Sequence, residues 1–137
     1  MAGKRFSEKL YNEDDNAKYQ VIDWLGEQGY HAYVNPDQYG IDVIAENGDE
    51  TYFYEVEVKH NWKGAKFIYS GIHWTERKIK FANPNSFFVM LNHERTHAFM
   101  TTWDVIQKSP VIVKNTKYTS NEKFIEVNIN DCVLIEF

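Results

Sequence analysis

Residues 52–62 read YFYEVEVKHNW, a stretch in which charged and apolar side chains alternate. Successive side chains of a β-strand point to opposite faces, so the alternation predicts a strand with one apolar and one charged face. The apolar face carries Tyr54, Val56 and Val58. The charged face carries Glu55, Glu57 and Lys59. A solvated strand often carries charge, so the neighbouring segments must indicate whether this face also performs chemistry.

A hairpin turn precedes this strand, since residues 47–49 read NGD, which is typical of a tight loop. The loop is predicted to join two strands, residues 41–46 and 50–60. A two-residue loop pairs Asp42 with Phe53 or Glu55, depending on which two residues form it. In both registers Asp42 projects on the same face as Glu55 and the other charged residues of the strand. A three-residue loop or a bulge would reverse this parity, so the inference depends on a tight turn.

Three carboxylates and an ammonium on one patch have a limited set of chemical uses. Their repulsion is relieved by raising a pKa, by pairing with Lys59 or by binding a cation. Ligand sets made only of oxygen suit Mg²⁺ or Mn²⁺ rather than zinc. A lysine beside such an ion orients or deprotonates a water and offsets the negative charge that grows on a phosphate. These groups together are those that phosphodiester hydrolysis requires.

The composition indicates one globular domain. The chain has 137 residues, 43% of them hydrophobic, which is enough to bury a core, and we predict a single domain over 1–137. The net charge of −5 argues against a protein that coats nucleic acid by bulk electrostatics. The single cysteine, Cys132, excludes an internal disulfide and argues against a cysteine metal cluster. The N-terminal residues lack the apolar stretch of a signal peptide, and we expect a cytoplasmic protein.

The order of predicted elements is that of an α/β protein with a central mixed sheet flanked by helices. A first helix begins near Asn12 and stops at Gly29. A second helix is predicted over 71–83, and a short third helix is capped by Thr101 or Thr102. Further strands are predicted at 86–92, at 96–102 and within 111–137.

An Asp at the start of one strand, a hairpin and then Glu-X-Lys on the next strand resemble the motif of the PD-(D/E)XK nuclease superfamily, which includes restriction endonucleases and Holliday-junction resolvases. The matching residues are Asp42 in YGIDVI and Glu57-Val58-Lys59 in EVEVK. The resemblance covers roughly residues 12–103. It implies a restriction-endonuclease-like core and an endonuclease that requires Mg²⁺, with Mn²⁺ as a substitute.

The resemblance also implies roles for individual residues. Asp42 and Glu57 would bind the metal together with the backbone carbonyl of Val58, and Lys59 would position the attacking water. Many members of the superfamily add an acid from the first helix, and we choose Asp14 because it lies one turn before the apolar face of that helix. The alternatives are its neighbours Glu13 and Asp15.

Two other acids near the motif need an interpretation. The residues NPD at 35–37 contain a literal Pro-Asp, but Asp37 precedes the strand and is predicted to be a turn residue. Asp42 is therefore preferred as the motif Asp. Glu55 has no fixed role in the superfamily, and we interpret it as a supporting group or an extra ligand.

A basic segment over 58–80 follows the acidic part of the chain. Its lysines and arginine are interleaved with aromatic residues such as Tyr69, which suits contact with a phosphate backbone and stacking on bases. The residues predicted to contact nucleic acid are Lys63, Lys66, His73 and Arg77. On the predicted second helix, His73, Arg77 and Lys80 fall on one face. A solvated amphipathic helix is the alternative interpretation.

We therefore predict an Mg²⁺-dependent endonuclease that acts on DNA. The alternatives are a protein with this fold that binds nucleic acid without cleaving it, and a nuclease directed at RNA. A homodimer with the C-terminal strands as its interface is left open. His93 and His97 have the spacing of a zinc pair on a helix, but their neighbours are strand-like, so we predict surface or hairpin histidines.

Overall fold

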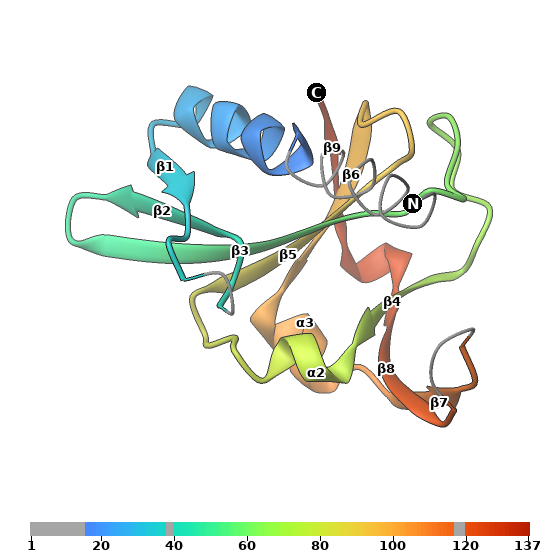
Figure 1. Ribbon diagram of the computed structural model, residues 1–137. Helices are drawn as coiled ribbons and strands as arrows, with labels where there is room; N and C mark the ends of the chain where they lie inside the picture. Colours follow the sequence, from blue (N-terminus) through green and yellow to red (C-terminus); the bar gives the residue numbers. More distant parts are fainter. Residues whose placement is uncertain (1–15, 38–39, 117–119) are drawn as a thin grey trace, which may run out of the picture.

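The computed structural model describes residues 16–37, 40–116 and 120–137. In this part of the chain, a mixed sheet with the strand order β1-β2-β3-β5-β6-β9 forms the centre of the fold (Figure 1). Its strands are β1 (His31–Val34), β2 (Val43–Asn47), β3 (Glu50–Val58), β5 (Ser86–Leu91), β6 (His97–Thr102) and β9 (Val133–Glu136). β3 and β5 are parallel, and the other neighbours are antiparallel. The predicted α/β class with a central mixed sheet is confirmed.

A smaller antiparallel sheet has the order β4-β8-β7. Its strands are β4 (Gly71–Thr75), β7 (Val111–Lys114) and β8 (Glu122–Asn128). The helical elements are a helix over 16–27, α2 (Glu76–Ile79), α3 (Trp103–Lys108) and the 3-10 turn η1 (Ile129–Asp131). Among the described residues, none of these helices has both the length and the apolar character needed to cross a membrane.

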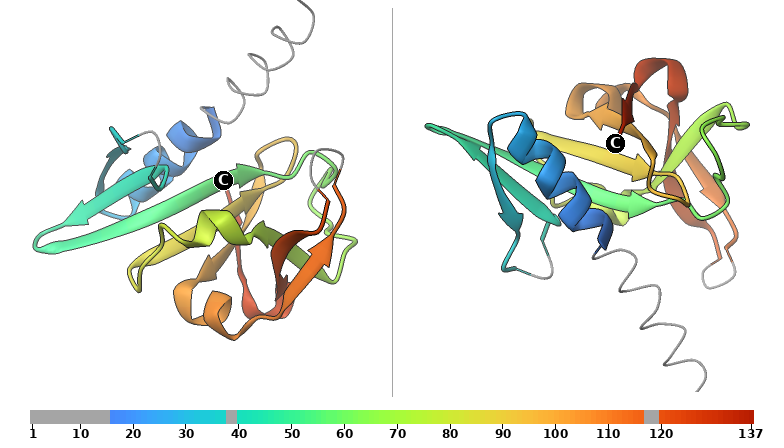
Figure 2. Two further views of the ribbon diagram at one scale, coloured as in Figure 1. Left: turned by 60° about the horizontal axis from the view of Figure 1, so that its bottom comes forward. Right: turned by 90° about the horizontal axis from the view of Figure 1, so that it is seen from above.

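The helix over 16–27 lies on one face of the larger sheet, and the smaller sheet lies on the opposite face together with α2 and α3 (Figure 2). The side chains of the helix over 16–27 form a core with alternate residues of the larger sheet. That core includes Ala17, Val21, Leu25, Val43, Tyr54, Val56, Val58, Val89 and Leu91. The smaller sheet and α3 form a second core on the other face. It consists of Ile72, Trp74, Phe88, Met90, Ile106, Ile125 and Val127. The even-numbered residues of β3 thus face the first core, and its odd-numbered residues face the side of the second.

The hairpin between β2 and β3 has the predicted tight turn. Asn47 pairs with Glu50, so Gly48 and Asp49 form the loop, and this register places position 42 opposite Glu55. Gly48 has a φ of 62°, a backbone conformation that favours glycine. The predicted parity is therefore confirmed: Asp42 and the acids of β3 project on one face of the sheet.

The helix predicted over 71–83 is wrong outside residues 76–79. Residues 71–75 form β4, because Ile72 and Trp74 alternate with polar neighbours and are both fully buried in the second core. β4 pairs with β8, and α2 covers only 76–79. The alternation of buried and polar side chains, which is the period of a strand, determined the structure here. The sequence analysis had instead relied on the helical spacing of the basic residues. His73 consequently lies on a strand and does not share a helix face with Arg77 and Lys80.

The remaining element predictions agree with the structure where it describes them. The strands predicted at 86–92 and 96–102 are β5 and β6. Thr102 caps α3, and its hydroxyl accepts a hydrogen bond from the backbone N–H of Val105. The first helix ends at residue 27, and Gly29, which has a φ of 95°, follows in the turn that terminates it. Its predicted start at Asn12 lies outside the described residues.

Candidate active site

Asp42 lies immediately before β2 and is fixed by two contacts. Its Oδ2 accepts a hydrogen bond of 2.8 Å from the backbone N–H of Val56 on β3. Its Oδ1 lies 3.4 Å from the ammonium of Lys18 on the first helix. The segment before it is compact, since the Asn35 side chain donates to the carbonyl of Ile41, and a Cβ on Gly40 would lie 2.9 Å from that same side chain. Asp42 therefore points across the hairpin from a fixed backbone.

Glu55 is the acid that contacts Asp42. It is 7% exposed and forms a side-chain hydrogen bond with Asp42. Burial, followed by the charge of Asp42, raises the pKa of Glu55 to about 8, and the charge of Lys78 only partly opposes this. Two carboxyl groups hydrogen-bond to each other only when one of them carries a proton, so the pair of Asp42 and Glu55 shares one proton. A cation bound between them would replace that proton.

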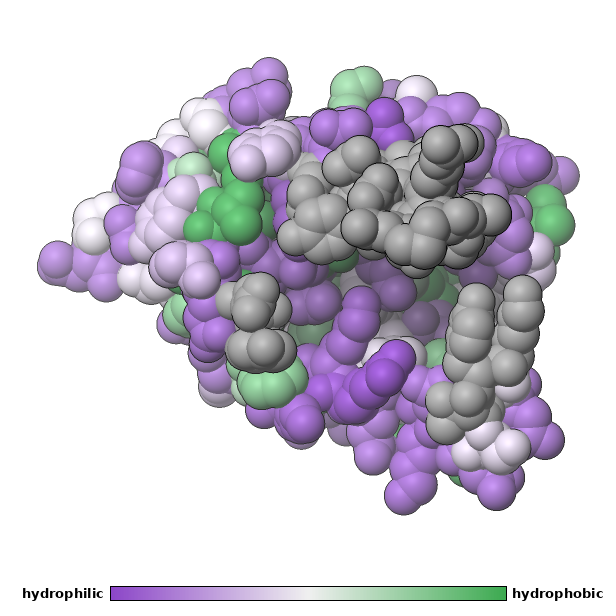
Figure 3. Space-filling model, in the orientation of Figure 1, coloured by the Kyte–Doolittle hydropathy of each residue, from purple (hydrophilic) through white to green (hydrophobic). Residues whose placement is uncertain are grey.

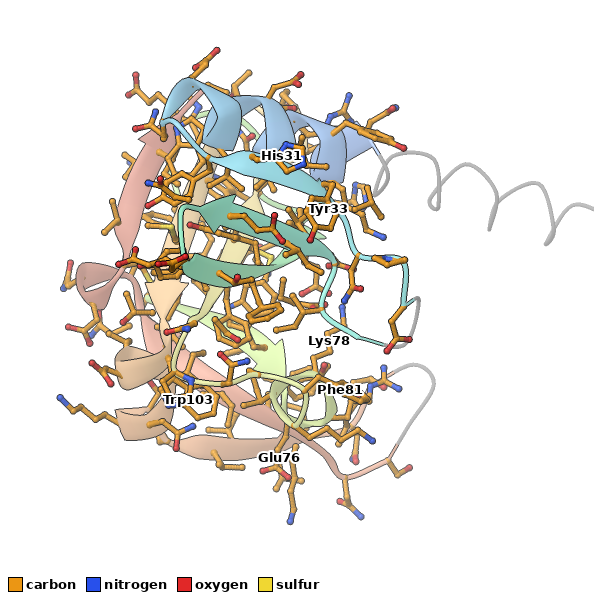
Figure 4. All side chains as sticks on the ribbon, turned by 90° about the vertical axis from the view of Figure 1, so that its left-hand side faces the viewer. His31, Tyr33, Glu76, Lys78, Phe81 and Trp103 are labelled. Carbon is orange, nitrogen blue, oxygen red and sulfur yellow. The ribbon has the colours of Figure 1, made fainter. Side chains whose placement is uncertain are left out.

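Lys78 on α2 supplies the positive charge over these acids. Its Nζ lies 3.7 Å from Glu55 Oε1 and 3.6 Å from Glu57 Oε1. Burial lowers the pKa of Lys78, but the charges of Glu57, Glu55 and Asp42 outweigh burial and leave its pKa raised. Figure 4 shows Lys78 pointing from α2 toward the strands of the larger sheet. The ammonium of Lys78 therefore stays charged at neutral pH and bridges two acids of β3.

A pocket of about 330 Å³ opens beside these groups. Its lining consists of Gly40, Asp42, Glu55, Arg77, Lys78, Lys80 and Phe81. The face of the molecule in Figure 3 is hollowed near its middle, and hydrophilic side chains surround the hollow. We call the group Asp42, Glu55, Glu57 and Lys78 the acidic site. It combines oxygen ligands, a cation and room for a phosphate group.

Lys59 lies in a second pocket. It follows β3, and its Nζ is 5.0 Å from the ring centroid of Tyr69. Burial, followed by the charge of Lys114, lowers the pKa of Lys59, and the charge of Glu57 opposes them. Glu57 is thus the link between Lys59 and the acidic site, whereas Asp42 and Glu55 line a pocket that Lys59 does not. The structure brings Asp42 together with Glu55 and Lys78 rather than with Lys59.

The other predicted site residues are dispersed. Lys63 and Lys66 are exposed on the loop before β4. His73 pairs with Glu126 of β8 at 2.8 Å, and Arg77 lies 3.6 Å from Glu122. The side chain of Val58 belongs to the first core. Asp14 and its neighbours Glu13 and Asp15 lie outside the described residues.

Asp37 lies in a turn, and His93 and His97 lie at a hairpin, as predicted. The carbonyl of Asp37 accepts a hydrogen bond from the N–H of Gly40 in the loop before β2. His93 lies in the connection between β5 and β6, and His97 begins β6. Among the residues that the structure describes, no three His, Cys, Asp or Glu side chains form a group that could hold a metal ion. The acidic site therefore offers two carboxylates in contact, with Glu57 nearby.

The sequence analysis gave no site role to Lys78 and no defined role to Glu55. The NGD turn could have indicated the role of Glu55, because a loop at Gly48 and Asp49 places Glu55 opposite position 42. No local signal indicates Lys78. It belongs to the basic segment in sequence, and only the packing of α2 near the hairpin brings it to Glu55.

Glu55 makes a testable contribution to the pH dependence of stability. Its pKa rises from 4.5 to about 8 on folding, so the folded state binds more protons between these values. The contribution is fully present below pH 4.5, and it is lost as the pH rises through about 8. The slope reaches about 1.4 kcal/mol of unfolding free energy per pH unit. We expect Glu55→Gln to remove this slope and to be more stable than the wild type at pH 8.5.

Denaturant unfolding at several pH values in chelator-containing buffer measures this effect. Glu27→Gln, which removes the same charge at an exposed position of the first helix, is the control and should keep the wild-type slope. An unchanged slope in Glu55→Gln would show that the Glu55 carboxyl is ionised in the folded protein at neutral pH.

The fold and the site define an α/β protein whose mixed sheet carries paired acids on one hairpin. No protein-family model matches the chain, and no curated protein matches it. Among solved structures, the chain is similar to a Holliday junction resolvase, Hjc, of the archaeal hyperthermophile Archaeoglobus fulgidus. The TM-score is 0.53 at 10% sequence identity, and the match covers 90% of this chain and 84% of the resolvase chain. This likeness is one of fold.

Proposed function

We propose that this chain is a divalent-metal-dependent endonuclease that hydrolyses phosphodiester bonds of DNA, and that it belongs with the PD-(D/E)XK nucleases. The observation that carries the proposal is that Asp42 and Glu55 lie opposite each other across the hairpin and line one pocket, with the Lys78 ammonium 3.7 Å from Glu55. The fold of a solved Holliday junction resolvase supports it.

The donor set of the acidic site fits Mg²⁺ or Mn²⁺. Both ions take oxygen ligands, and Mg²⁺ is commonly held by one or two carboxylates that leave places for waters and substrate phosphate. Asp42 and Glu55 supply two carboxylates in contact beside an open pocket. Glu57, the carbonyl of Val58 and Asp14, which the superfamily resemblance implies, are the further candidates. When bound, the ion would polarise the scissile phosphate and neutralise part of its charge.

The protein side chains would orient the water and stabilise the charge that develops during hydrolysis. Hydrolysis forms a bond from a water oxygen to phosphorus and breaks one ester bond, so the water loses a proton and the leaving oxygen gains one. Lys78 keeps its charge because its pKa is raised, which makes it a hydrogen-bond donor and not a base. We assign to Lys78 the orientation of the water or phosphate and the offset of the growing negative charge. The superfamily motif assigns this role to Lys59, and a comparison of the two variants decides between them.

The choice of DNA rests on the resolvase fold and on the basic residues near the acidic site. Arg77, Lys78 and Lys80 line its pocket, and cations at such a place attract a phosphate backbone. A branched DNA is the first substrate to test, because a solved structure with a similar fold is that of a Holliday junction resolvase. Val133 and Leu134 are about half exposed on β9, the edge strand of the larger sheet, which supports the homodimer left open from the sequence.

A metal-dependence assay tests the proposal. Labelled four-way junctions, linear duplex DNA, single-stranded DNA and RNA are incubated with the protein in Mg²⁺, Mn²⁺ or a chelator. We expect cleavage of DNA in either metal and none in the chelator. Binding without cleavage under every condition would instead identify a nucleic-acid-binding protein without the chemistry, and cleavage of RNA alone would identify a nuclease directed at RNA.

A further inference from the structure

The second pocket lies where the larger and the smaller sheet meet. It has a volume of about 300 Å³, and residues of both sheets and of the loop before β4 form it. They are Lys59, Asn61, Tyr69, Ser70, Gly71, His73, Lys114 and Glu126. The pocket thus contains two lysines from different sheets, one aromatic ring and several hydrogen-bonding groups.

The charges in this pocket favour an anion. Lys59 comes from the end of β3 and Lys114 from the end of β7, and they lie close enough for the charge of Lys114 to act on Lys59. The carboxylate of Glu126 is already paired with His73 at 2.8 Å. Lys114 contacts the other ring nitrogen of His73. Two ammonium groups gathered in one pocket repel each other, and a bound phosphate relieves that repulsion.

The position of this pocket relates it to the acidic site. Residues 55, 57 and 59 follow one another on one face of the chain, so the two pockets lie in line, with Glu57 between them. At about 3.3 Å per residue, Glu55 and Lys59 are roughly 13 Å apart. A polynucleotide strand is long enough to reach both pockets, while a small phosphodiester is not.

We propose that Lys59 and Lys114 bind a second backbone phosphate of the substrate strand, beyond the phosphodiester that the acidic site hydrolyses. This inference rests on the proposed nuclease function and deepens it by naming the residues that hold the strand away from the reaction centre. Tyr69, which is 40% exposed, presents its ring beside Lys59 and offers a surface on which an unpaired base stacks. Lys59 is then a binding residue, and Lys78 acts at the reaction centre.

Two substrates of different length test the inference. The full chain is assayed in Mn²⁺ with a labelled DNA oligonucleotide and with bis(4-nitrophenyl) phosphate, which fills only the acidic site. We expect Lys114→Ala to raise KM for the oligonucleotide about tenfold and to leave its kcat and the hydrolysis of the small ester as in the wild type. The variant should also reduce the slope of log affinity against log salt by about 0.7 to 0.9.

Lys123→Ala is the matched control, since Lys123 is an exposed lysine of β8 outside the pocket. It should retain the wild-type KM. A wild-type KM in Lys114→Ala, or an equal loss on both substrates in that variant, would overturn the inference. If the wild type hydrolyses neither substrate, the proposed function fails instead. The pocket is then tested by the binding of the labelled oligonucleotide in a chelator: weaker binding by Lys114→Ala supports the inference, and unchanged binding overturns it.

Discussion

Asp42→Asn is expected to lower the rate of metal-dependent DNA cleavage about 1000-fold and to leave the fold intact. The change removes the charge of one proposed metal ligand, and charge stabilisation by a bound metal supplies several kcal/mol, each 1.36 kcal/mol being a factor of ten in rate. The asparagine oxygen still accepts the hydrogen bond from Val56 N–H, so the hairpin should keep its geometry. Single-turnover cleavage of a labelled junction, together with circular dichroism, measures both outcomes.

The matched control for this variant is Asp37→Asn. Asp37 belongs to the literal Pro-Asp of the sequence, but it lies in the loop before β2 and does not line the pocket of the acidic site. We expect Asp37→Asn to cleave at the wild-type rate. Full activity in Asp42→Asn would remove Asp42 from the mechanism, and a loss in Asp37→Asn alone would make the literal Pro-Asp the functional one.

Lys78→Ala should have the second largest effect, a fall in kcat of about 100-fold at saturating substrate. Lys78 is the cation that touches both Glu55 and Glu57, and removing one preorganised donor from a reaction centre typically costs two to three orders of magnitude. Lys78→Arg should recover only part of the rate, because a planar guanidinium does not reproduce the point charge of an ammonium. Steady-state kinetics over a range of oligonucleotide concentrations separate the effect on kcat from that on KM.

Lys59→Ala and Lys108→Ala complete this comparison. Lys108 is exposed at the end of α3, and its replacement should change neither constant. The geometry predicts a fall in kcat for Lys78→Ala and a rise in KM for Lys59→Ala. A fall in kcat for Lys59→Ala with a wild-type kcat for Lys78→Ala would favour the role that the sequence motif assigns to Lys59.

The hairpin and the charged face of β3 could be predicted because they depend on local rules. The NGD turn sets the register, and the period of two sets the face, so the position of Asp42 relative to the acids of β3 follows without knowledge of the rest of the chain. The position of the loop in this turn also determines that Asp42 lies opposite Glu55. The superfamily motif drew attention to Glu57 and Lys59 instead, two residues further along the strand.

Tertiary contacts account for what the sequence analysis missed. Lys78 reaches Glu55 because β4 and α2 pack beside the hairpin, and nothing near Lys78 in the sequence specifies that contact. The helix predicted over 71–83 was wrong over 71–75 because the burial of Ile72 and Trp74 against β8 outweighed the helical spacing of the basic residues. That error also placed His73 and Arg77 on one surface, whereas they pair with different residues of β8.

The alternation along β3 limits how such a site can change during evolution. A one-residue insertion or deletion in this strand would exchange its two faces, moving Glu55 and Glu57 into the core under the first helix and Val56 into the pocket of the acidic site. A substitution at position 55, 57 or 59, by contrast, leaves every side chain on the same face of the sheet as before. A side chain that serves the acidic site can therefore move along the strand only in steps of two, or be replaced by a residue from a separate element, as Lys78 of α2 is placed to do.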